Sequence, residues 1–190
     1  MDHITQKLEV LYDLLVDNFD TVEAELKDLI ANPDRIEDTN KFASLLVNLQ
    51  RSAFIDPLLL QISLSDKEDT WLRDFLYAAI ILLEESSVNE NFHIPEQLIG
   101  KLEAWILDGK QELSWKSATL LKFYENESAE RIQLLKLEER GDFFLTYAEC
   151  ILGLLRVDKK KHWDLVKQIS VDDTHDEKLR EFAKDVIKSC

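Results

Sequence analysis

A short helical pattern recurs along this chain at intervals of 30 to 40 residues. Each copy has an alanine followed by an apolar residue three positions later. In four of the five copies an aromatic residue precedes the alanine and a second apolar residue follows at the fourth position. In the remaining copy a serine precedes the alanine and Lys122 takes the fourth place. The five alanines are Ala43, Ala78, Ala118, Ala148 and Ala183. Repeats of this length predict pairs of helices that stack on one another, because a single pair cannot bury both of its faces.

The composition favours an all-α chain. Only 4 glycines and 3 prolines are present among 190 residues, too few for the many tight turns of an all-β fold. We expect ten or eleven helices in one domain, with residues 1–38 as N-terminal capping helices and residues 39–190 as repeat hairpins. Two sequences, Ser65 to Glu68 and Thr174 to Glu177, have the spacing of a capping box that begins a helix.

We expect a cytoplasmic protein. The longest apolar run, residues 75–83, is too short to cross a bilayer, and the N-terminus lacks a basic segment followed by an apolar one. The two cysteines, Cys150 and Cys190, form no disulfide framework, which suits a reducing compartment.

The repeated pattern resembles the HEAT-like α-helical repeats. Leu72-Arg73 and Leu179-Arg180, each shortly before a repeated alanine, look like the Leu/Val-Arg pair of that family, and Asp176 matches its acidic position. The resemblance covers about residues 40–190 and implies an α-solenoid of stacked antiparallel hairpins. The alternative is an irregular helical bundle that packs its alanines without a regular repeat.

No catalytic or metal-binding motif is present. None of His3, His93, His162 and His175 lies three or four residues from another histidine or from a cysteine. The acids around His175 coincide with a helix start, where acidic caps are expected. We expect Cys150 to act as a small buried hydrophobic residue. The four tryptophans are expected in the core or in a groove wall, with exposed anchors for a partner as the alternative. We therefore predict no enzyme, no cofactor and no metal.

Charge provides the strongest functional signal. The formal net charge is −15, with 19 acids and 7 bases in residues 1–95 against 19 acids and 16 bases in residues 96–190. Glu9, Asp13 and Asp17 follow one another at helical spacing, so they predict a stripe of like charge that no basic neighbour relieves. Such a stripe either keeps the protein soluble or docks a cationic protein. The partner-binding candidates are Glu9, Asp13, Asp17 and Asp20, with a second patch of Asp66, Glu68, Asp69 and Asp74.

These features predict an acidic binding module that sequesters a basic protein. By type, small acidic helical chains of this kind resemble bacterial immunity proteins of contact-dependent growth inhibition, which implies a basic toxin domain, most concretely a nuclease, as the partner. The expectation excludes nucleic acid, membranes and small-molecule substrates as partners. A general helical scaffold or assembly chaperone and an enzyme acting on a cationic substrate are the alternatives.

Overall fold

The chain folds as an array of α-helices. The computed structural model describes residues 18–86, 92, 95–108, 110–139 and 143–189. These residues form nine α-helices and two 3₁₀ turns, and no strand occurs among them. The elements are α2 (Phe19–Ala31), η1 (Pro33–Arg35), α3 (Thr39–Leu49), η2 (Ser52–Phe54), α4 (Ile55–Leu64), α5 (Leu72–Glu85), α6 (Glu96–Asp108), α7 (Gln111–Leu121), α8 (Glu127–Glu138), α9 (Phe144–Val171) and α10 (Glu177–Lys188). The expected all-α class is confirmed, and no described helix has the length and hydropathy that a membrane span requires.

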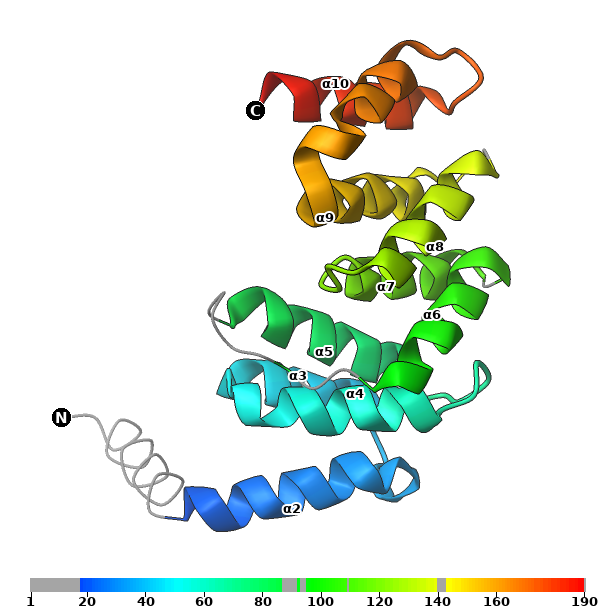
Figure 1. The fold of residues 1–190 in the computed structure, drawn as a ribbon. Helices are drawn as coiled ribbons and strands as arrows, with labels where there is room; N and C mark the ends of the chain where they lie inside the picture. Colours follow the sequence, from blue (N-terminus) through cyan, green and yellow to red (C-terminus); the bar gives the residue numbers. More distant parts are fainter. Residues whose placement is uncertain (1–17, 87–91, 93–94, 109, 140–142, 190) are drawn as a thin grey trace, which may run out of the picture.

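The helices follow one another from α2 at one end of the molecule to α10 at the other (Figure 1). The series α3, α5, α7, α9 and α10 is connected by contacts between consecutive members. A second series, α2, α4, α6 and α8, is connected in the same way. Contacts of α4 with α5, α6 with α7 and α8 with α9 join the two series.

The repeated alanines all belong to the first of these series. Ala43, Ala78, Ala118, Ala148 and Ala183 lie on α3, α5, α7, α9 and α10 and are all buried, none being more than 6% exposed. An alanine lets two helix backbones approach closely where a larger side chain would hold them apart. The short pattern in the sequence therefore identifies the members of the first series of helices.

Both predicted capping boxes are wrong. The Ser65 hydroxyl donates to the carbonyl oxygen of Ile62 at 2.7 Å and so belongs to the end of α4, while α5 begins only at Leu72. At the other box, Asp176 caps α10 by accepting from the backbone N–H groups of Lys178 and Leu179. In each case the hydroxyl donates to a nearby oxygen, of Ile62 or of Asp172, and the helix begins further along the chain, at Leu72 or Glu177.

Helix α9 contains a break at Asp158. The backbone of Asp158 is extended (φ −156°, ψ 98°), and its carboxylate accepts a hydrogen bond from the N–H of Lys161 at 3.0 Å. This is the geometry of an N-cap, so two helical segments meet there at a kink. The sequence predicts separate helices over residues 143–157 and 160–169, which agrees with the position of the break.

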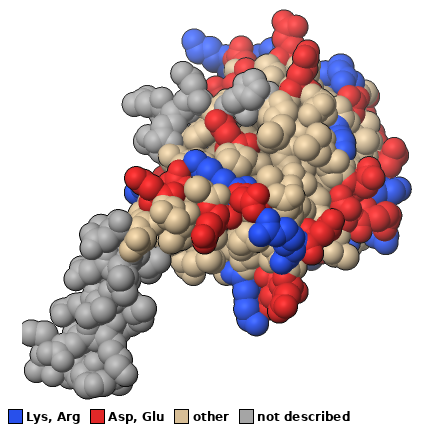
Figure 2. All heavy atoms as spheres, turned by 90° about the horizontal axis from the view of Figure 1, so that it is seen from below, with Lys and Arg blue, Asp and Glu red and all other residues tan. Residues whose placement is uncertain are grey.

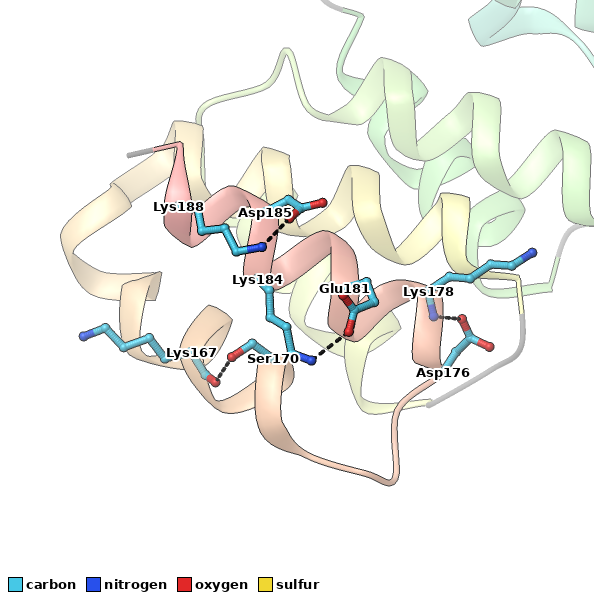
Figure 3. Close-up of polar contacts among 8 residues, drawn as sticks. All are labelled: Lys167, Ser170, Asp176, Lys178, Glu181, Lys184, Asp185 and Lys188. Atoms are coloured by element: carbon cyan, nitrogen blue, oxygen red, sulfur yellow. Dashed lines mark hydrogen bonds and ion pairs between the residues drawn. The ribbon is translucent and has the colours of Figure 1, made fainter.

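Helix α10 closes the C-terminal end with a polar outer face. Glu181 pairs with Lys184 at 2.7 Å and Asp185 pairs with Lys188 at 3.0 Å, both on the side of α10 drawn in Figure 3. Its other side buries Leu179 and Ala183 against the core. A polar outer face is the usual property of the terminal unit in a stack of helices.

The cap at Asp176 provides a first prediction. We expect Asp176→Ala to lower the free energy of unfolding by about 1 kcal/mol, because two backbone N–H groups lose their acceptor at the start of α10. Asp173→Ala is the control, because Asp173 is exposed and its substitution removes the same charge close to the cap. Urea unfolding followed by circular dichroism measures both. Equal stability of the two variants would contradict the capping role.

Candidate binding surface

Helix α4 is apolar on two faces, only one of which is covered. Ile55, Leu58 and Ile62 are completely buried. On the opposite side Leu60 and Leu64 are 51% and 61% exposed. A helix that is apolar all round is normally buried all round, and leucines four positions apart lie next to each other on one face. The outward face of α4 is therefore a candidate docking surface.

A groove runs along this face between α2, α4 and α6. It has a volume of about 940 Å³. Ala31 from α2, Pro57 and Leu60 from α4, and Pro95 before α6 give it an apolar lining, and Asp56 and Glu96 add carboxylates. We call it the apolar groove.

A second groove continues from the first. It lies between the turn at residues 65–68 and α6, has a volume of about 680 Å³, and shares Gln97 with the apolar groove. Asp66, Glu68 and Asp108 are among its lining residues. We call it the acidic groove. Lys101 also lines it, and the Lys101 ammonium group donates to the carbonyl oxygen of Ser65, which fixes the lysine against the turn.

The structure brings together some of the predicted acids and separates others. Asp66 and Glu68 line the acidic groove, and the Asp69 carboxylate accepts from the Asp66 N–H at 2.7 Å. Asp74 instead accepts from Thr39 and Asn40, which ties the start of α5 to the start of α3.

The first predicted patch lies mostly beyond the described part of the chain. Asp20 is exposed in the first turn of α2. Glu9, Asp13 and Asp17 lie outside the described residues. Their role as a docking stripe stays a prediction.

The excess of acid persists in the described N-terminal part. Residues 18–86 carry 14 acidic and 6 basic side chains, whereas residues 143–189 carry 9 of each. Some acids are neutralised locally, as in the Glu23–Lys27 pair at 2.7 Å and the Asp38–Lys41 pair at 2.9 Å. Figure 2 shows basic side chains interspersed among the acidic ones at the α2 end, with uncharged areas between them. This end is therefore acidic on balance but is not a continuous anionic surface.

The buried thiol of Cys150 is not a candidate reactive group. Burial raises the pKa of the Cys150 thiol to about 12, so the thiol stays protonated and unreactive at neutral pH. The expectation that Cys150 is a small buried residue is confirmed. No cluster of three or more metal-ligating side chains occurs in the described part of the chain. Trp71 and Trp105 are buried, as expected for core residues, and Trp105 also lines the acidic groove.

Glu130 joins α8 to the second segment of α9. It forms an ion pair with Lys161, and its Oε1 lies 3.0 Å from Nε2 of His162. A hydrogen bond from Lys161 is the main reason that the pKa of Glu130 lies below its usual value of 4.5. A carboxylate with a lowered pKa stabilises the fold fully above its unfolded-state value, and this contribution disappears as the pH falls through the folded-state pKa.

We therefore expect Glu130→Gln to flatten the acid side of the stability profile. The wild-type protein should lose stability faster than the variant as the pH falls below about 4.5, because only the wild type must protonate this carboxylate. Thermal unfolding at a series of pH values measures the difference. Glu125→Gln is a control for charge removal, because Glu125 is exposed and its guanidinium partner, Arg156, lies at 3.7 Å. Parallel profiles for the wild type and Glu130→Gln would contradict the prediction.

The exposure of Leu60 and Leu64 is not predicted from the sequence. The available signal was the composition of residues 55–64, where seven of the ten positions are apolar or proline and only Asp56, Gln61 and Ser63 are polar. Such a segment predicts complete burial, and nothing in its local pattern tells which side stays open.

Comparison with known proteins provides no relative. No protein-family model matches the chain, and neither a curated protein nor a solved structure matches it. We therefore infer function from the shape and charge of the surface.

Proposed function

We propose that the chain is an α-solenoid of HEAT-like hairpins. The support comes from the two series of helices in chain order, from the buried alanine on every member of one series, and from the polar outer face of α10. In this arrangement α4–α5, α6–α7 and α8–α9 are the hairpins. Stacked hairpins expose long surfaces, which many proteins of this architecture use for binding other proteins.

We propose further that this solenoid is a binding module for a basic protein. The observation that carries the proposal is the exposed apolar face of α4, set in a groove in the acidic half of the chain. Buried apolar contact supplies affinity, while the acidic surroundings speed encounter with cationic partners and disfavour anionic ones. In its most specific form the module is an immunity protein that occludes a nuclease toxin, whose cationic cleft would suit an acidic inhibitor.

Affinity capture from a native lysate tests the proposal. The immobilised wild-type chain is compared with a Glu9→Lys/Asp13→Lys/Asp17→Lys variant and an Asp66→Lys/Glu68→Lys variant. We expect the wild type to retain a basic protein that associates about tenfold more slowly at 0.5 M than at 0.05 M salt, because salt screens the steering field. At least one of the two charge-reversed variants should fail to retain this basic protein. Equal recovery by all three proteins would contradict an electrostatic role.

A general scaffold or assembly chaperone is the second candidate. The apolar groove favours it, since a site lined by Ala31, Pro57, Leu60 and Pro95 can accept several partners. Such a scaffold would bind with an association rate that changes little with salt. The same kinetic measurement therefore separates the two candidates.

A further inference from the structure

We propose that the apolar groove and the acidic groove together bind one amphipathic α-helix of the partner, with leucine-like residues on one side and lysine or arginine along its flank. This inference rests on the proposed binding function and identifies the recognised segment.

The length of the site fits a helix. The residues that α6 contributes to the two grooves include Gln97, Lys101, Ala104 and Asp108. They are spaced by three or four positions, so they form one face along nearly the whole of α6. The face extends for about 17 Å, which is the length of roughly 11 helical residues.

The surface chemistry also favours a helix over an extended peptide. An extended peptide gains most of its affinity by adding to the edge of a sheet, and the described residues contain no strand. Pro57 and Leu60 line the apolar groove instead, and the exposed Leu64 follows on the same face of α4 four positions after Leu60. A row of such apolar side chains packs against the apolar positions of another helix.

The charges around the two grooves select a basic helix. Two of the three lining cations already have partners: Lys27 pairs with Glu23 at 2.7 Å, and Lys101 donates to the Ser65 carbonyl oxygen. Lys67 adds one more positive charge. The lining carboxylates outnumber these three cations and are contributed by Asp56, Glu96, Asp66, Glu68 and Asp108.

Charge argues against two other occupants. A second copy of this chain carries a net charge of −15 and would bring acid against acid. Residues 1–17 contain an apolar series, but they hold four acids and a single lysine. A cationic helix from another protein is the occupant that complements the site.

A model peptide tests the inference directly. The probe is a fluorescein-labelled helix of about 18 residues, made only of leucine and lysine, with leucines at i, i+3, i+4 and i+7. A second peptide has glutamate in place of lysine. Fluorescence anisotropy measures the binding of both peptides to the full-length chain.

The groove variant is Leu60→Gln/Leu64→Gln, which leaves the charge unchanged. Leu135→Gln/Val171→Gln is the matched control, because these residues are also exposed but lie on α8 and α9.

We expect the Leu/Lys peptide to bind the wild type and the control variant equally. The groove variant should bind it at least about tenfold more weakly, as expected when two leucines lose their contact. The Leu/Glu peptide should bind the wild type at least about tenfold more weakly than the Leu/Lys peptide does.

Other results overturn the inference and identify the alternative. Equal peptide affinity in the wild type and the groove variant means that cationic helices bind elsewhere, and the proposed function then stands without this site. A dimer in sedimentation equilibrium that the groove variant abolishes means that a second copy occupies the groove. A gain of about tenfold in peptide affinity on deletion of residues 1–17 means that the chain's own terminus occupies it. Failure of both peptides to bind removes the inference, while capture of a basic protein from lysate decides the proposed function independently.

Discussion

Phe75→Ala is expected to lower the free energy of unfolding by about 3–5 kcal/mol. Phe75 is completely buried in α5, and its ring centroid lies 5.0 Å from that of Trp71 and 6.2 Å from that of Phe42 on α3. The substitution opens a cavity where α5 meets its neighbours, and two aromatic contacts are lost with it. A protein of this size has a total stability of about 5–15 kcal/mol, so a loss of this size removes a large part of it.

Tyr77→Ala is the matched control for Phe75→Ala. Tyr77 lies two positions along the same helix but is 41% exposed. We expect its loss to cost less than about 1 kcal/mol, because most surface substitutions have small effects. Urea unfolding of both variants, followed by tryptophan fluorescence and by circular dichroism, gives the comparison. Similar stabilities would show that α5 is not central to the packing.

The second large effect is expected at a glycine inside α9. A Cβ atom at Gly153 would lie 2.2 Å from Nε2 and 2.7 Å from Cδ of Gln133 on α8. Gln133 is completely buried, and its amide atoms have no hydrogen-bond partner in the described residues. The dense packing around this side chain leaves it little room to move. We expect Gly153→Ala to cost about 1–3 kcal/mol through overpacking, despite the better helix propensity of alanine.

Two further variants give this prediction its controls. Gly100→Ala in α6 meets no atom within 4 Å, so it should stabilise the protein by about 0.5–1 kcal/mol through the backbone effect alone. Adding Gln133→Ala to Gly153→Ala should recover part of the lost stability, because the clash is removed together with a buried amide. If Gly153→Ala is as stable as Gly100→Ala, the close contact between α8 and α9 does not exist in solution.

The sequence predicts the helices better than it predicts the surface. The spacing of Ala43, Ala78 and Ala148 indicates the helices that pack in chain order, because a buried alanine is a local sign of close helix contact. The capping-box pattern places the starts of α5 and α10 too early, at Ser65 and Thr174. In the structure the Ser65 hydroxyl donates to the Ile62 carbonyl oxygen and the Thr174 hydroxyl donates to the Asp172 carboxylate. The sequence does not show which of the possible hydrogen bonds forms.

The binding surface depends on contacts between distant residues, which the local sequence does not specify. Asp66 and Asp74 are close in sequence, but the first lines a groove with α6 and the second binds α3. Leu60 resembles its buried neighbours Leu58 and Leu59 in type and is exposed only because of where α2 and α6 lie. Periodicity gives the faces of a helix but not the neighbour that covers each face.

We propose above that cationic partners bind to the outward side of α4 and α6, where carboxylates line the two grooves. Hydrogen exchange of the full-length chain, with and without the Leu/Lys peptide, tests it most directly, since bound elements open less often and exchange more slowly. We expect slowed exchange to be concentrated in Ile55–Leu64 and Glu96–Asp108, with α10 unchanged. Protection centred on α9 and α10, or spread evenly over the helices, would contradict it.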